Sequence, residues 1–170
     1  MFVFGTAEDV FTMAVRIEEN GHAFYSGAAE KAKDQETRKL FEQLATMEAN
    51  HIEAFKSLKS SLPETALSPG IWDPEGLAES YLQASADTHI FTLEAASSRL
   101  KNINTAQEAL SMAIQFEKDS VAFFLGMKEI LPDPKGKSQI DQLIRAEMEH
   151  VRMLTLTARN LSESDITGIA

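Results

Sequence analysis

A glutamate interrupts the apolar stripe near the middle of each of four predicted helices. Apolar residues that recur every three or four positions mark the face of a helix that packs into a core. A carboxylate on such a face loses several kcal/mol of hydration unless it is paired, protonated or bound to a metal ion. The sequence therefore predicts either an unusual solvated helix or a site inside a helical bundle. The four glutamates are Glu18, Glu48, Glu117 and Glu147.

The chain repeats itself at a separation of 99 residues. Residues 6–58 align with residues 105–157 without a gap, and 14 of the 53 aligned positions are identical. The positions that match are stronger evidence for a repeat than the overall percentage of identical residues. The four stripe glutamates align in pairs, and His51 aligns with His150. Each half is therefore expected to form one hairpin of two antiparallel helices.

Local signals place the ends of the helices. Thr6 is followed three residues later by an acidic residue, and so is Thr105, a spacing that caps a helix start. Breaks are expected near residues 33–36 and at residues 131–138, where the second break contains two prolines and a glycine. Two short links of this kind predict an all-α fold of two helix hairpins.

A long segment separates the two halves. Its first part is rich in proline and glycine, and a weaker helical pattern follows from about residue 77 to residue 100. A connection of this length can travel the length of a four-helix bundle. We expect one domain over residues 1–170, with hairpins at 6–62 and 105–161 and a crossover at 63–104 that contains an accessory helix.

Composition excludes several classes of function. A formal net charge of −10 argues against a basic surface that binds nucleic acid or an anionic membrane. The absence of cysteine excludes disulfides, thiolate zinc sites and iron-sulfur clusters within this sequence. No stretch approaches the roughly 18 apolar residues of a membrane span, and no basic, apolar leader is visible. The expected location is the cytoplasm.

The repeat supplies a complete set of metal-ligand residues. Each half contributes one glutamate from its first helix and a Glu-x-x-His pair from its second, and residues three apart lie on one helix face. Four carboxylates would balance the charge of two divalent ions. Residue chemistry alone predicts a dinuclear site suited to Fe or Mn, with Zn possible, and leaves a purely structural polar core as the alternative. The six candidates are Glu18, Glu48, His51, Glu117, Glu147 and His150.

Other candidates have weaker support. Glu19 and His22 have the same Glu-x-x-His spacing, but their face is rotated from the stripe and their counterparts are Lys118 and Val121, so we expect a surface position. His89 has no evident partner in the crossover and is expected at the surface or in a local hydrogen bond. Trp72, also in the crossover, is expected to be a packing anchor rather than a substrate platform.

Two segments resemble a known family. IEENGHAFYSGAAEKA, residues 17–32, is similar to the first helix of rubrerythrin-like proteins in the ferritin-like superfamily, where a ligand glutamate precedes a glycine by three residues and a Phe-Tyr pair by six and seven. FEKDSVAFF, residues 116–124, repeats this pattern around Glu117. The resemblance covers nearly all of residues 6–160 except the crossover. It implies a ferritin-like antiparallel four-helix bundle.

The resemblance also implies a di-iron carboxylate site, held by the six candidate ligands, that reacts with peroxide or dioxygen. Tyr25 lies seven residues after Glu18 on the same face, so its hydroxyl could bond a ligand carboxylate or relay a proton; an aromatic core residue is the alternative. Rubrerythrins have a further ligand glutamate where this chain has Ser120, and a C-terminal rubredoxin domain that we expect to be absent here. The ligand set is therefore nearer to that of bacterioferritin-type ferroxidase centres.

The leading functional hypothesis is a non-haem di-iron oxidoreductase that reduces hydrogen peroxide in oxidative-stress defence. It would use two iron ions, and an external electron donor protein would supply the electrons. The alternative is an iron-handling ferroxidase that oxidises Fe(II) with dioxygen, and a third hypothesis is a structural bundle stabilised by metal. Family resemblance and apolar residues on outward faces predict a homodimer, with no nucleic-acid or membrane partner.

Overall fold

Four long helices form the protein in a computed structural model, which describes residues 7–62, 76–77, 80–82, 84, 105–130 and 134–167. These residues contain no strand, and the predicted all-α class is confirmed. The first hairpin consists of α1 (Ala7–Lys31) and α2 (Gln35–Ser60), and the second consists of α5 (Ala106–Ile130) and α6 (Pro134–Thr167).

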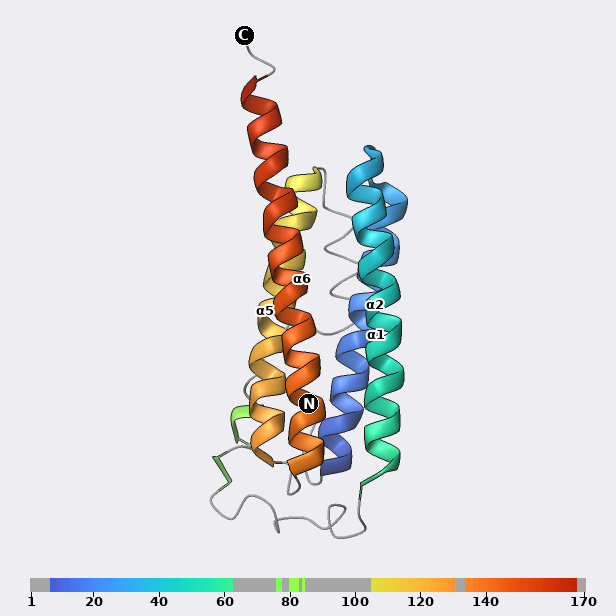
Figure 1. Ribbon diagram of the computed structural model, residues 1–170, viewed down its shortest axis with the longest axis vertical. Helices are drawn as coiled ribbons and strands as arrows, with labels where there is room; N and C mark the ends of the chain where they lie inside the picture. The colour runs from blue at the N-terminus through green and yellow to red at the C-terminus, as the bar shows by residue number, and fades with distance from the viewer. Residues whose placement is uncertain are drawn as a thin grey trace.

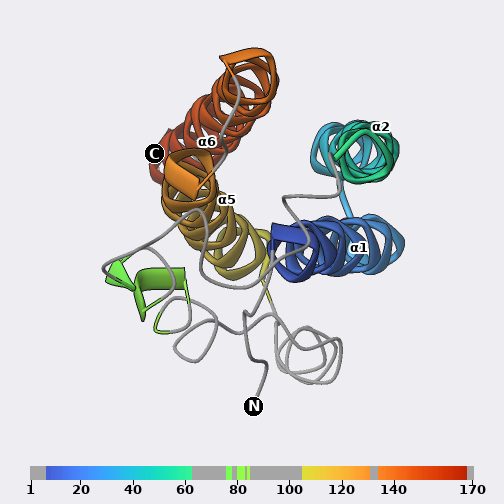
Figure 2. The same ribbon diagram turned by 90° about the horizontal axis from the view of Figure 1, so that it is seen from below.

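The two hairpins pack side by side into a bundle. Besides its hairpin partner, α1 packs against α5 and α2 packs against α6, which gives the square seen end-on in Figure 2. Figure 1 shows α1 and α6 running in one direction and α2 and α5 in the other, so neighbouring helices are antiparallel. The end of α2 and the start of α5 lie at opposite ends of the bundle.

Helix starts follow the capping signals in the sequence. The Glu108 amide donates to Thr105 Oγ1 at 3.1 Å, and the Thr105 amide donates to Glu108 Oε2 at 3.3 Å, which is the predicted reciprocal cap of α5. At the start of α2, Asp34 Oδ1 accepts a 2.7 Å bond from the Thr37 amide. This second cap lies within the predicted break at residues 33–36. Thr6 lies outside the described residues.

The bounds of α6 differ from those predicted. It begins at Pro134, inside the segment expected to be a break, and ends at Thr167 rather than at residue 161. Proline is tolerated in the first turn because the amides there have no helical partner to lose. After residue 161 the sequence contains no helix-stopping glycine or proline until Gly168. Figure 1 shows the end of α6 projecting beyond the neighbouring helices.

Part of the predicted accessory helix is described. Residue 77, residues 80–82 and residue 84 are helical, and Leu82 is fully buried in the core. Tyr81 Oη donates a 2.9 Å bond to the Ala122 carbonyl of α5. The remaining part of the crossover, with His89 and Trp72, lies outside the described residues.

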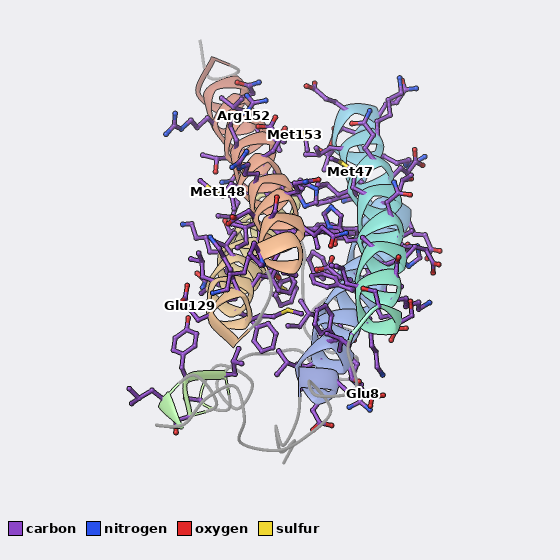
Figure 3. All side chains as sticks on the ribbon, turned by 60° about the horizontal axis from the view of Figure 1, so that its bottom comes forward. Glu8, Met47, Glu129, Met148, Arg152 and Met153 are labelled. Carbon is purple, nitrogen blue, oxygen red and sulfur yellow. The ribbon has the colours of Figure 1, made fainter. Side chains whose placement is uncertain are left out.

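The apolar core is divided into two clusters by the middle of the bundle. One cluster is centred on Phe11, Phe55 and Phe124, and the other on Phe41 and Leu110. On every helix the stripe glutamate lies between residues of the two clusters. Figure 3 shows side chains of both hairpins filling the space between them, whereas Met148 of α6 is 57% exposed. Among the described helices, none is long and apolar enough to cross a membrane.

Candidate metal centre

All six predicted ligands meet in the polar band between the apolar clusters. None is more than 8% exposed. Their ligand atoms form two overlapping groups, within each of which the atoms lie within 4.8 Å of one another. Each group contains one glutamate that is absent from the other group, and we name the group after that glutamate. The Glu18 group is Glu18, Glu48, His51 and Glu147, and the Glu117 group is Glu48, Glu117, Glu147 and His150.

Each histidine faces the glutamate that only its own group contains. His51 Nδ1 lies 3.4 Å from Glu18 Oε2, and His150 Nδ1 lies 3.3 Å from Glu117 Oε1. The imidazole rings are stacked, with centroids 5.3 Å apart and an angle of 16° between their planes. The repeat in the sequence is therefore reproduced as two similar half-sites.

Two glutamates are shared between the half-sites. Glu147 places Oε1 2.8 Å from His51 Nδ1 and Oε2 2.9 Å from His150 Nδ1. Glu48 places Oε2 3.6 Å from His51 Nδ1 and Oε1 3.4 Å from His150 Nδ1. Each of these carboxylates thus offers one oxygen to each half-site. That arrangement is suited to bridging two metal ions.

Several buried ligand atoms lack a hydrogen bond. In the described structure, these atoms are Glu18 Oε1, both carboxylate oxygens of Glu147, Nδ1 of His51 and both ring nitrogens of His150. Buried polar atoms are normally satisfied, because an unmade bond costs about 1 to 3 kcal/mol. The short approaches of histidine nitrogen to carboxylate oxygen are therefore contacts between potential ligand atoms. Oxygen and imidazole donors of this kind fit Fe, Mn or Zn.

Burial dominates the electrostatics of the two unshared glutamates. Burial, followed by repulsion from Glu48 and Glu147, raises the pKa of Glu18 well above its usual range. Burial and then repulsion from Glu48 do the same for the pKa of Glu117. Without a metal ion, both carboxyl groups hold a proton more tightly than they would in water.

The pKa values of the two shared glutamates are lowered, whereas those of the two histidines are raised. Burial raises the pKa of Glu48, but a hydrogen bond with Glu18 and then contacts with the histidines outweigh it, so that pKa is lowered. Burial and repulsion from Glu48 raise the pKa of Glu147, but contacts with the two histidines outweigh them and lower it. Burial lowers the pKa of His150, but contacts with its neighbouring carboxylates raise it to about 12. The pKa of His51 is raised in the same way. In the metal-free cluster, the histidines and the unshared glutamates therefore hold protons more tightly, and the shared glutamates less tightly, than the same groups do in water.

Tyr25 joins the two halves of the site. Its buried hydroxyl donates a hydrogen bond to Glu117 Oε1, although Tyr25 belongs to α1 and Glu117 to α5. Burial and repulsion from Glu117 raise the pKa of the hydroxyl, so it keeps its proton. The predicted bond to a candidate ligand carboxylate is present. The sequence placed Tyr25 on the face of Glu18, and only the packing of the hairpins revealed that its partner is Glu117.

The other Glu-x-x-His pair lies outside the cluster. Glu19 is exposed, as expected, and His22 is half-buried rather than at the surface. Neither belongs to a group of metal-ligand atoms found among the described residues. Gly21, one turn after Glu18, lies against the cluster, since a Cβ atom there would be 3.4 Å from Glu48 Cδ.

A cavity of about 280 Å³ lies at the end of the bundle where α1 and α2 are joined. Its lining combines Phe41 and small residues of α1 and α5 with the charged residues Lys31, Lys33 and Asp34. The Phe41 ring stacks on that of Tyr25, with centroids 6.1 Å apart. Sequence reasoning did not find this cavity. The runs of alanine at Ala28, Ala32 and Ala109 were its only signal.

Comparisons with known proteins agree with this geometry. The rubrerythrin family matches residues 9–70, which contain the first hairpin and three of the six candidate ligands. A crystal structure of a candidate ferritin-like diiron-carboxylate protein from Thermotoga maritima superposes with a TM-score of 0.70 and 24% identity, covering 94% of this chain and 98% of that chain. No protein with a curated description matches the sequence. The first half of the chain is therefore similar to the rubrerythrin family, and the chain as a whole has the fold of the Thermotoga maritima protein, as the resemblance in the sequence predicted.

Proposed function

We propose that this protein is a di-iron oxidoreductase that reduces hydrogen peroxide. The observation that carries the proposal is the pair of overlapping ligand groups with two shared carboxylates. These six residues would hold two metal ions, and iron bound there would supply the electrons that reduce a small oxidant. The match of the first hairpin to the rubrerythrin family supports iron as the resident metal.

The reaction needs two electrons and two protons for each peroxide. Two bound ferrous ions would each supply one electron, so that H2O2 and two protons become two water molecules. The six side chains would hold the ions, with Glu48 and Glu147 between the half-sites. Tyr25 is a positioning residue in this scheme, because its hydroxyl holds a proton against Glu117 Oε1.

The buried surroundings of the site would keep water away from the reaction. Apolar clusters lie on both sides of the ligand band along the bundle, and His150 and Glu147 are almost completely buried. Exclusion of water strengthens the electrostatic interactions of the ligands and protects reactive species from side reactions. These features support turnover of a small oxidant rather than of a large substrate.

Restoring the ferrous state requires electrons from outside the site. The sequence contains no cysteine, so it cannot form a thiolate-bound iron centre. We propose an external electron donor protein as the partner. We also propose a homodimer, for which large exposed apolar residues on α5 and α6, Leu125, Met148 and Leu156, are candidate contacts.

A ferroxidase is the second candidate. Ser120, buried one turn after Glu117, occupies the position of the further ligand glutamate in rubrerythrins. The remaining four glutamates and two histidines form a symmetric set, which supports stoichiometric oxidation of Fe(II) by dioxygen in an iron-handling protein.

Rapid mixing separates the two activities. Protein loaded with Fe(II) without oxygen should hold two irons per chain and react much faster with peroxide than with dioxygen, with repeated turnover when a reductant is supplied. His51→Ala should abolish the reaction, whereas His22→Ala should leave it intact. Fast oxidation by dioxygen alone, without turnover, would favour the ferroxidase. Less than one bound transition metal per chain after loading would overturn both activities.

A further inference from the structure

The two half-sites are related by the repeat, but their surroundings differ. Tyr25 aligns with Phe124 and Glu18 aligns with Glu117. A symmetric site would therefore have two tyrosines, each donating to the unshared glutamate of the opposite hairpin. Only one of these bonds can exist in this chain, because phenylalanine has no hydroxyl.

The tyrosine in one half-site and the phenylalanine in the other give the two unshared glutamates, Glu117 and Glu18, different surroundings. The Tyr25 hydroxyl holds Glu117 Oε1, which also lies 3.3 Å from His150 Nδ1. In the described structure, Glu18 Oε1 is buried and accepts no hydrogen bond. Glu117 Oε1 is therefore held by a hydroxyl of the opposite hairpin, whereas Glu18 contacts Glu48 and His51 but its Oε1 atom has no such partner.

The histidines of the two half-sites also differ in solvent exposure. The side chain of His150 is 0% exposed, whereas that of His51 is 11% exposed. An ion in the Glu117 group would be screened less by water and would have a longer path to solvent. An ion in the Glu18 group would lie nearer to the surface and to exchange.

We propose that the two metal positions are inequivalent, and that the hydrogen bond from Tyr25 to Glu117 makes the Glu117 group the tighter position and the Glu18 group the exchangeable one. This inference rests on the proposed dinuclear site. The physical reason is preorganisation: a ligand held by a hydrogen bond loses less freedom when it binds an ion. Loss of such an outer contact typically weakens metal binding by about 10- to 100-fold.

Titration of the metal-free protein with Mn(II) tests the proposal without any catalytic readout. Calorimetry and the electron paramagnetic resonance signal of free Mn(II) should resolve two binding steps in the unaltered chain. Tyr25→Phe should weaken the tighter step by about 10- to 100-fold and leave the other step nearly unchanged. Phe124→Tyr should strengthen the weaker step. Tyr81→Phe is the matched control, because that hydroxyl bonds the Ala122 carbonyl.

Two further variants assign the steps without changing Tyr25. Glu117→Gln should remove the tighter step, and Glu18→Gln should remove the weaker one. Two equal steps in the unaltered chain, an unchanged tighter step in Tyr25→Phe, or the reverse assignment would each overturn the inference while leaving the dinuclear site intact. If no Mn(II) or Fe(II) binds to the unaltered chain, the proposed function fails as well.

Discussion

His51 Nδ1 lies 2.8 Å from Glu147 Oε1, although the two residues belong to different hairpins. The nearest carboxylate oxygen to this histidine is therefore supplied by α6 and not by Glu48 on its own helix, whose closest approach is 3.6 Å. Each half-site is completed by the other half of the chain. Binding of a metal ion here would therefore be coupled to docking of the two hairpins.

Shared and unshared glutamates should have different effects when changed. Glu147→Gln weakens one ligand of each group, so the affinity for both ions should fall by about 10- to 100-fold or more. Glu18→Gln should spare one ion, because Glu18 belongs to one group only. Metal analysis after gel filtration measures the stoichiometry. Glu149→Gln is the control, since Glu149 is exposed and pairs with Arg152. Equal losses in the Glu147 and Glu18 variants would contradict the shared arrangement.

Metal ions should stabilise the fold strongly. An ion that binds only the folded state adds about 2.7 kcal/mol at a free concentration of 100 Kd. Two independent ions should raise the melting temperature by about 10 to 20 °C, since 1 kcal/mol corresponds to about 2 to 4 °C in a domain of this size. Thermal unfolding with Mn(II) and with a chelator measures the difference. A melting temperature insensitive to both would argue for a metal-free structural core.

Metal binding should release protons. The pKa values of Glu18, Glu117, His51 and His150 are all raised, so the metal-free cluster holds protons more tightly than these groups do in water, and metal ions must displace the protons that it holds. Calorimetry in buffers with different ionisation enthalpies measures the number released. Release of fewer than about one proton per two ions would contradict this protonation state.

The change in the free energy of unfolding with pH should have opposite signs in the metal-free and the metal-bound protein. In the metal-free protein, the raised pKa values of Glu18 and Glu117 favour the folded state below their ordinary value of 4.5, and this stability is lost as pH rises through the raised values. In the loaded protein, rising pH removes the competing protons and strengthens binding. Denaturant unfolding of both forms between about pH 5 and 9 should therefore give slopes of opposite sign. Parallel slopes would refute the idea.

Gly21 should tolerate a methyl group but no larger side chain. The added Cβ would lie 3.4 Å from Glu48 Cδ, an ordinary contact, and alanine favours a helix by about 1 kcal/mol over glycine. Gly21→Ala should raise the free energy of unfolding by about 0.5 to 1 kcal/mol and keep both ions. Gly21→Leu should displace Glu48 and reduce metal content. Loss of metal in the alanine variant would show that the site needs more space than the contact suggests.

Much of the fold followed from local rules in the sequence. The period of the apolar stripes and the Thr105 cap predicted the helices, and the repeat predicted two hairpins. The end of α6 lies six residues beyond the predicted residue 161, because no glycine or proline that could stop the helix follows until Gly168. The cavity beside Phe41 was not predicted, because it depends on the packing of helix ends that are distant in sequence.

The sequence by itself determined the candidate ligands, because a glutamate or histidine in a buried stripe is costly on any helix and its spacing fixes which face it occupies. The repeat then determined that such residues occur as two matching sets. Only the tertiary structure decided which glutamates are shared, that Tyr25 bonds Glu117, and that His51 is the more exposed histidine. Helical period fixes the direction of a side chain from its own axis, whereas contacts between hairpins depend on how the axes are placed, and the packing of both apolar clusters sets that placement.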